Sequence, residues 1–280
     1  MVYDLLVMVV LFAWSFARII QKKILKAPDL EGLEFAKWTI IIGAILVLPL
    51  IFFVKLSPIN IMLGIFLVSI LWIFEQAPKF IAIKKEEISR LMAFSHFKFF
   101  FAIVLTILLL GETATINTIL GGILMIIGGT SIGLERNFFK KVKFSNVALL
   151  LFLLSMFVSG IAYFWRQFLL QRADPISIIF FSTIFAAILI SPTIKKKPNI
   201  KNFKLFLFAQ FLMVYGFLLL LWILSKQELV FTVPLLAIQP LIILILGRRI
   251  LKESKQTFLI RFIGIILIIL GYIILKGFLI

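Results

Sequence analysis

The stretch KKEEISRLMAFSHFKFFFAIVLTILLLGETATINTILGGILMIIGG, residues 84–129, has a weaker copy later in the chain. The copy is SKQELVFTVPLLAIQPLIILILGRRILKESKQTFLIRFIGIILIILGY, residues 225–272. Glu87 aligns with Glu228, and further along a pair of glycines recurs with the same spacing in both copies. Apolar segments around a short polar joint, repeated in the same order, indicate an internal repeat.

Apolar residues dominate the whole chain and not only the repeat. Hydrophobic residues make up 63% of the 280 residues, and the mean hydropathy is +1.19. A helix needs about 20 apolar residues to cross a bilayer, and lipid cannot satisfy the backbone amides of an irregular segment. The apolar runs are continuous, whereas barrel strands alternate apolar and polar residues. The sequence therefore predicts an all-α membrane protein with no room for a soluble domain.

We expect ten transmembrane helices joined by short polar loops. The predicted spans are 3–21, 33–54, 59–83, 88–110, 114–134, 146–169, 175–194, 203–224, 229–247 and 258–278. Because the number of spans is even, both termini are expected on the same face of the membrane.

The 29 Lys and Arg residues are distributed unevenly between the two faces. Most belong to joints on the face opposite the termini, and the face of the termini receives only Lys55, Arg172, Lys226 and Lys276. By the positive-inside rule, the basic joints are cytoplasmic and both termini are extracellular, in the cell membrane. The net charge of +17 then reflects topology and contact with anionic lipid, so no nucleic-acid partner is expected.

The repeat divides the chain into two halves of five helices, residues 1–144 and 145–280. Because five is odd, the second half must be inverted relative to the first. The charges agree, since the joint LLGETAT has no Lys or Arg and its counterpart GRRILKESKQ is strongly basic. Inverted repeats are typical of secondary transporters, whose substrate site lies near the middle of the bilayer between the repeats. We therefore expect two inverted five-helix repeats around a central cavity.

In these motifs the chain resembles the EamA-like ten-helix transporters of the drug/metabolite transporter superfamily. The resemblance rests on the LLGE segment and its glycines at 105–128, on the RRILKE copy at 248–271, and on a layout that covers the whole chain. It implies a secondary carrier, typically an exporter, of small metabolites such as amino acids. Members of the family more often have cytoplasmic termini, whereas the charges here place them outside. We expect a monomer, with a dimer as the alternative.

Ionisable groups inside the spans are the first candidates for substrate binding, because they are costly there and usually face the interior of the bundle. Glu75 has three readings: a proton-coupling carboxylate, a ligand for a substrate amine, or the structural partner of a lysine. Lys98 lies near the midplane, where it either pairs with Glu75 or binds an anionic substrate group. The repeat aligns Lys98 with Gln239, so the two side chains would face each other across a twofold axis.

Other candidates for the site are less specific. His96 is two residues from Lys98, which points the two side chains about 200° apart on a helix, so one faces the cavity and the other a neighbouring helix. A lone histidine is more often a packing residue than a ligand. Trp14, Trp72 and Tyr215 lie deep in their spans, where they either line an amphipathic pocket or simply pack.

Two arginines and six glycines complete the set. Arg18 and Arg166 lie nearer to span ends, where long side chains can reach the membrane interface; attraction of anions to the mouths of the cavity is the alternative. Small residues allow close contact between membrane helices. The expected inter-repeat contact involves Gly121, Gly122, Gly128, Gly129, Gly264 and Gly271.

The chemistry that the sequence lacks narrows the function. With no cysteine and one histidine, the chain has no disulfide and no thiolate or multi-histidine metal site, so neither metal nor cofactor is expected. The few intramembrane carboxylates argue against an enzyme, and scattered polar residues argue against a channel. No G-x-x-x-x-G-K-[ST] segment occurs, so a gradient should drive alternating access, with proton coupling as a hypothesis. A flippase for an anionic lipid-linked carrier is the alternative.

Overall fold

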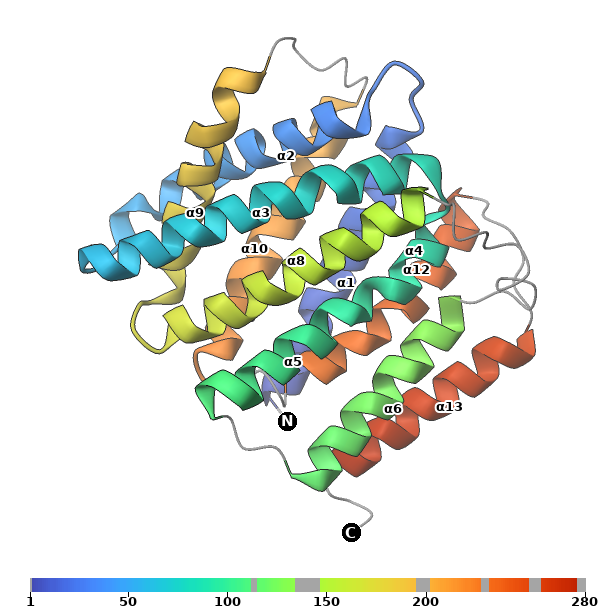
Figure 1. The fold of residues 1–280 in the computed structure, drawn as a ribbon. Helices are drawn as coiled ribbons and strands as arrows, with labels where there is room; N and C mark the ends of the chain where they lie inside the picture. The colour runs from blue at the N-terminus through green and yellow to red at the C-terminus, as the bar shows by residue number, and fades with distance from the viewer. Residues whose placement is uncertain are drawn as a thin grey trace.

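The computed structural model describes residues 2–111, 115–133, 147–194, 202–227, 232–251 and 258–275. These residues form a bundle of helices in which α1 begins and α13 ends at the same end (Figure 1). Within the described residues, six helical stretches are long and apolar enough to cross a membrane. They are α1 (Val2–Leu25), α2 (Gly32–Val47) with η1 (Leu48–Phe53), α3 (Ile59–Lys85), α8 (Val147–Leu170), α9 (Pro175–Ile190) with η3 (Ser191–Thr193), and α10 (Phe203–Leu224).

The remaining predicted spans correspond to shorter or interrupted helices. α6 (Ile116–Gly133) and α13 (Phe258–Leu275) are single helices. The predicted span 88–110 is divided into α4 (Ile88–Ala93), η2 (Phe94–His96) and α5 (Phe97–Leu110). The predicted span 229–247 corresponds to η4 (Val233–Ile238) and α12 (Gln239–Leu246), followed by the π-helical η5 (Gly247–Leu251).

The two interruptions fall at equivalent places in the repeat, because residues 94–96 align with residues 235–237 inside η4. Each has a local cause. The Ser95 hydroxyl donates to the carbonyl of Met92 at 2.6 Å, a local bond that competes with the helical ladder. A proline in the first turn of η4 removes a backbone donor. Discontinuous helices at matching positions of two repeats are characteristic of transporter binding sites.

The helices of one half pack on those of the other in a repeating pattern. α1 packs on α10 as α3 packs on α8, and α5 packs on α8 as α1 packs on α12. α2 packs on α9, and α6 on α13 (Figure 1). By the repeat, α1, α2, α3, α5 and α6 are equivalent to α8, α9, α10, α12 and α13. Exchanging the two halves therefore converts each of the first four pairs into another pair of the set and leaves α2 with α9 and α6 with α13 unchanged, as the two-repeat architecture requires.

The contact between α6 and α13 depends on glycine. A Cβ atom built on Gly128 would lie 2.6 Å from the carbonyl oxygen of Gly264, and one on Gly271 would lie 2.6 Å from that of Gly121. These distances are too short for any side chain, so the predicted close glycine contact is confirmed. The pairing runs in opposite directions along the two helices, which are therefore antiparallel, as equivalent helices of an inverted repeat must be.

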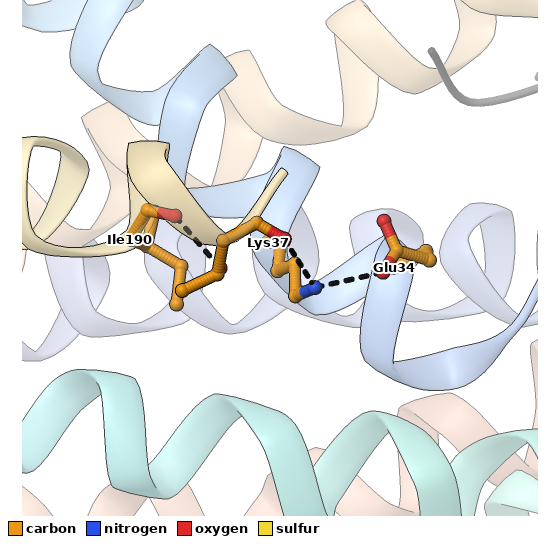
Figure 2. Close-up of polar contacts among 4 residues, drawn as sticks. Glu34, Lys37 and Ile190 are labelled. Carbon is orange, nitrogen blue, oxygen red and sulfur yellow. Dashed lines mark hydrogen bonds and ion pairs between the residues drawn. The ribbon is translucent and has the colours of Figure 1, made fainter. Parts of the chain in front are cut away.

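Polar contacts join α2, η1 and the residues that follow them to α9 with η3 at both ends. At one end, Lys37 Nζ donates to Glu34 Oε1 at 2.8 Å and to the carbonyl of Thr193 at 2.9 Å, where η3 finishes (Figure 2). At the other end, the amide of Lys55 donates to Ser177 Oγ at 2.9 Å, and this hydroxyl lies 3.0 Å from the carbonyl of Lys55. We call these the Lys37–Thr193 tie and the Lys55–Ser177 tie.

An aromatic cluster packs three helices beside the polar interior. The ring centroid of Phe35 lies 4.9 Å from that of Phe80 and 5.0 Å from that of Phe206, and all three side chains are fully buried. The cluster joins α2, α3 and α10, and Gly32 lets α2 approach the backbone of α3 closely. It forms an apolar support for the charged residues described next.

Candidate functional site

A cavity lies between the two halves, and its lining residues come from α1, α2, α3, α4, η2, α5, α8, α9, α10 and α12. About 100 Å³ of it is open to the centres of water molecules. Since one water needs roughly 10–15 Å³ on this measure, the cavity holds several. Its polar lining residues come from both halves: Arg18, Gln21, Thr39, Glu75, Gln76, Lys79, Ser95, Lys98, Ser159, Arg166, Ser182, Thr183, Gln210 and Gln239.

Most of the residues predicted for the site reach this cavity. Trp14, Trp72, Glu75, Lys98 and Gln239 all line it. The structure thus brings together Lys98 and Gln239, the pair that the repeat aligns. Their role in binding stays a prediction.

One further candidate lies elsewhere, and another is not described. Tyr215 donates its hydroxyl to the carbonyl of Leu46 at 3.0 Å, and it lines a separate depression that also includes Lys55 and Asp174. The side chain of His96 falls outside the part of the chain that the structure describes.

The lysine that contacts Glu75 is Lys79, one turn further along α3. Glu75 Oε1 lies 2.6 Å from Lys79 Nζ, and the two side chains are 11% and 2% exposed. The i,i+4 spacing places the two groups on one face of the helix. The sequence predicts a lysine as one possible partner of Glu75, and the i,i+4 spacing is the signal that identifies Lys79 as that lysine. The pair removes one cation and one anion from the charge balance of the cavity.

Lys98 and Arg166 share an aromatic wall. Lys98 Nζ lies 5.5 Å from the ring centroid of Tyr163 and 5.9 Å from that of Trp14. The guanidinium carbon of Arg166 lies 5.8 Å from the ring of Tyr163 and 4.8 Å from that of Phe217. Cations over aromatic faces gain electrostatic stabilisation, more so when desolvated. The rings therefore hold two positive charges at the cavity.

The expectation that Arg166 reaches the membrane interface is wrong. Its side chain is only 4% exposed and lines the cavity. Ser159, Tyr163 and Arg166 recur at helical spacing on α8, so the packing of α8 on α3 and α5 turns all three inward. Arg18 lines the cavity as well, donating from Nη1 to Gln21 Oε1 at 2.9 Å.

Close approaches of the backbone position two of the lining residues. A Cβ atom on Gly160 would lie 2.8 Å from the carbonyl oxygen of Lys98, so glycine lets α8 contact α5 at the residue that carries the ammonium. Trp14 Nε1 donates to the carbonyl of Met213 at 3.3 Å, and a Cβ on Gly216 would lie 2.9 Å from that nitrogen. The site is therefore held by helix contacts across the two halves.

A helical membrane protein whose two related halves enclose a charged cavity has the architecture of a small-molecule transporter. The chain belongs to the EamA-like transporter family, whose model matches residues 1–133 and 146–276. This confirms the resemblance to the drug/metabolite transporter superfamily and makes the chain a multi-pass membrane transporter of small molecules. Members of this family are transporters and not enzymes.

The comparison of structures agrees on the fold. A solved structure described only as "Crystal structure of protein" superposes with a TM-score of 0.73. The match covers 99% of this chain and 96% of the other, at 12% sequence identity. At this identity the likeness extends to the fold alone. No curated protein matches the sequence.

Proposed function

We propose that this chain is a secondary active transporter that moves small polar or amphipathic metabolites by alternating access. The observation that carries the proposal is a cavity lined by charged residues from both halves of an EamA-like chain. Buried ionisable groups in a membrane protein are retained where substrates or ions pass. Amino acids and export from the cell are the substrate class and direction that the family suggests.

The membrane arrangement that we propose has ten spans in two inverted repeats, residues 1–144 and 145–280. The antiparallel contact of α6 with α13 through glycine supports the inversion. The distribution of Lys and Arg supports cytoplasmic basic joints, in contact with anionic lipid, and extracellular termini in the cell membrane. The protein would work as a monomer, because each chain contains a complete cavity.

Alternating access in this arrangement is a rocking of one half against the other. The two ties between α2 and α9 lie at opposite ends of that interface. A rocking motion opens one end as it closes the other, so each state would retain one tie and weaken the other. The cavity would then face alternate sides of the membrane.

Proton coupling through Glu75 remains our hypothesis, together with Lys98. A proton on Glu75 would cancel its attraction for Lys79 and leave the ammonium free to move toward a substrate. The test is substrate-driven pH change in proteoliposomes containing Glu75→Gln. Coupled proton movement should disappear while substrate exchange continues. The control is Glu34→Gln, which removes the partner of Lys37 outside the cavity. Undiminished proton movement in Glu75→Gln would remove Glu75 from this role.

A flippase for an anionic lipid-linked carrier is the second candidate, because the cationic lining suits a lipid phosphate as well. Translocation of a fluorescent lipid analogue, measured beside uptake of a soluble metabolite, separates the two functions.

A further inference from the structure

The cavity has more positive than negative side chains. Among its described lining residues, Arg18, Lys79, Lys98 and Arg166 are cationic and only Glu75 is a carboxylate. Glu75 is paired with Lys79. Buried charges without compensation are costly, most of all inside a membrane protein. Arg18 and Arg166 are two buried cations beside this pair, and a ligand that carries negative charge would add to the compensation that Glu75 provides for them.

Hydrogen-bond donors give independent evidence for such a ligand. The Nε of Arg166, the Oγ of Ser159 and the Nε2 of Gln21 are buried and have no hydrogen-bond partner among the described residues. Their side chains are 4%, 1% and 1% exposed, and all three line the cavity. A buried donor without an acceptor costs more free energy than a typical hydrogen bond contributes. Water in the cavity can supply an acceptor, and a ligand that displaces this water must supply the acceptor itself.

The guanidinium of Arg166 favours an acceptor group with several oxygens. Ser159 and Arg166 lie seven residues apart on α8, which puts them on the same face two turns from each other. The fork of a guanidinium matches a carboxylate or a phosphate, and such charge-assisted bonds are stronger than neutral ones. Phe217 holds the guanidinium carbon 4.8 Å from its ring centroid, which restricts where the fork can point.

The other part of the wall is apolar. Trp14 stacks on Phe217 with ring centroids 6.1 Å apart, and Met156, Met213 and Val214 also line the cavity. Methionine side chains adapt to irregular apolar shapes. The wall therefore offers an anion-binding group beside a surface for a flat or apolar body.

Resting on the proposed function, we propose that the transported ligand carries a carboxylate or phosphate that accepts hydrogen bonds from Arg166, with an apolar or aromatic body against Trp14 and Phe217. An amino acid satisfies this through its carboxylate, but its amine finds only Glu75, which Lys79 already occupies. A ligand with net negative charge should therefore bind at least as well as a zwitterion of the same shape.

Three probes of the same shape test the charge requirement on the full chain in proteoliposomes. Phenylalanine has both groups, 3-phenylpropionate lacks the amine, and phenethylamine lacks the carboxylate. We expect 3-phenylpropionate to be taken up or to compete at least as well as phenylalanine, and phenethylamine to fail. If phenethylamine is transported and the two probes with a carboxylate are not, this inference is overturned and the proposed function stays intact. If none of these three probes is transported, and neither are the phenyl phosphate and the lipid described next, both this inference and the proposed function are contradicted.

The source of the anion is settled by two further probes. Phenyl phosphate represents a soluble phosphate, and a short-chain fluorescent phosphatidic acid represents a lipid head group. Uptake of phenyl phosphate alone supports a soluble metabolite. Movement of the lipid alone supports the same anion recognition in a flippase, and would overturn the secondary transporter of soluble metabolites.

Variants of Arg166 separate ligand recognition from a structural role. Arg166→Gln should raise the dissociation constant of the anionic probe about 10- to 100-fold, the range for a hydrogen bond to a charged group, and Arg166→Lys should lose less. Without ligand, Arg166→Gln should keep or raise the melting temperature, because it removes one buried positive charge from a cavity with an excess of cations. The control is Arg172→Gln, an exposed arginine outside the cavity. Unchanged probe affinity, or a large loss of melting temperature without ligand, would overturn the inference.

Discussion

The buried pair of Glu75 and Lys79 allows the sharpest prediction about stability. Glu75→Gln leaves the Lys79 ammonium, 2% exposed, without its carboxylate and with only the ring of Phe80, 5.7 Å from Nζ, nearby to compensate. Removing one partner of a buried ion pair typically lowers the free energy of unfolding by about 3–5 kcal/mol. The pair of Glu34 and Lys37 has the same charges at i,i+3 spacing with side chains 30% and 12% exposed, so it is better solvated than the pair in the cavity, and solvated pairs are worth about 1 kcal/mol or less.

The assay is reversible unfolding in detergent micelles, read as the free energy of unfolding for a double-mutant cycle. Glu75→Gln and Lys79→Met should each be strongly destabilising, and the double variant should recover most of the loss because no uncompensated charge remains. Glu34→Gln should change little. If Glu75→Gln costs no more than Glu34→Gln, or if the double variant is as unstable as the sum of the singles, the pair is not desolvated as the structure shows it.

Three further outcomes follow from close contacts. Gly128→Leu should prevent the assembly of α6 with α13, because even a Cβ at this position would lie 2.6 Å from the carbonyl oxygen of Gly264. Overpacking of this kind costs about 1–3 kcal/mol or more. The measurement is the yield of folded protein, and the control is Ile127→Leu on the exposed side of α6. Gly160→Val should push α5 away and lower probe affinity together with melting temperature. Lys37→Met should weaken one tie and speed labelling of a cavity cysteine, Ser182→Cys, from that end about 2- to 5-fold; unchanged labelling would exclude a gating role for this tie.

Much of the fold was accessible from the sequence, because hydropathy, charge and glycine spacing act over long segments. The limits of the helices follow the predicted spans closely, and the glycine contact lies where the repeat placed it. The interruptions at 94–96 and in η4 were not predicted, because they depend on short-range bonds such as that of Ser95 inside otherwise apolar segments.

The site was predicted less completely. Glu75, Lys98 and Gln239 stood out because charged or amide groups are rare at mid-span, and all three line the cavity. Arg166 was assigned to the interface because distance from the span end was considered without the direction of the side chain. The helical spacing of Ser159, Tyr163 and Arg166 along α8 predicts that Arg166 shares their inward face. Tyr215 was predicted at the site from its depth in the span, but depth does not determine which face of α10 the side chain occupies, and its hydroxyl bonds to Leu46 instead.

Double electron–electron resonance tests the account most directly, and the absence of natural cysteine makes the labelling simple. One label pair, at Leu33 and Ser191, reports on the end with the Lys37–Thr193 tie, and another, at Leu56 and Arg172, on the end with the Lys55–Ser177 tie; all four sites are exposed. Rocking of two inverted halves predicts that an anionic probe lengthens one distance and shortens the other. The rocking motion would be contradicted if both distances lengthen or both shorten, or if neither distance changes when a transported probe is added.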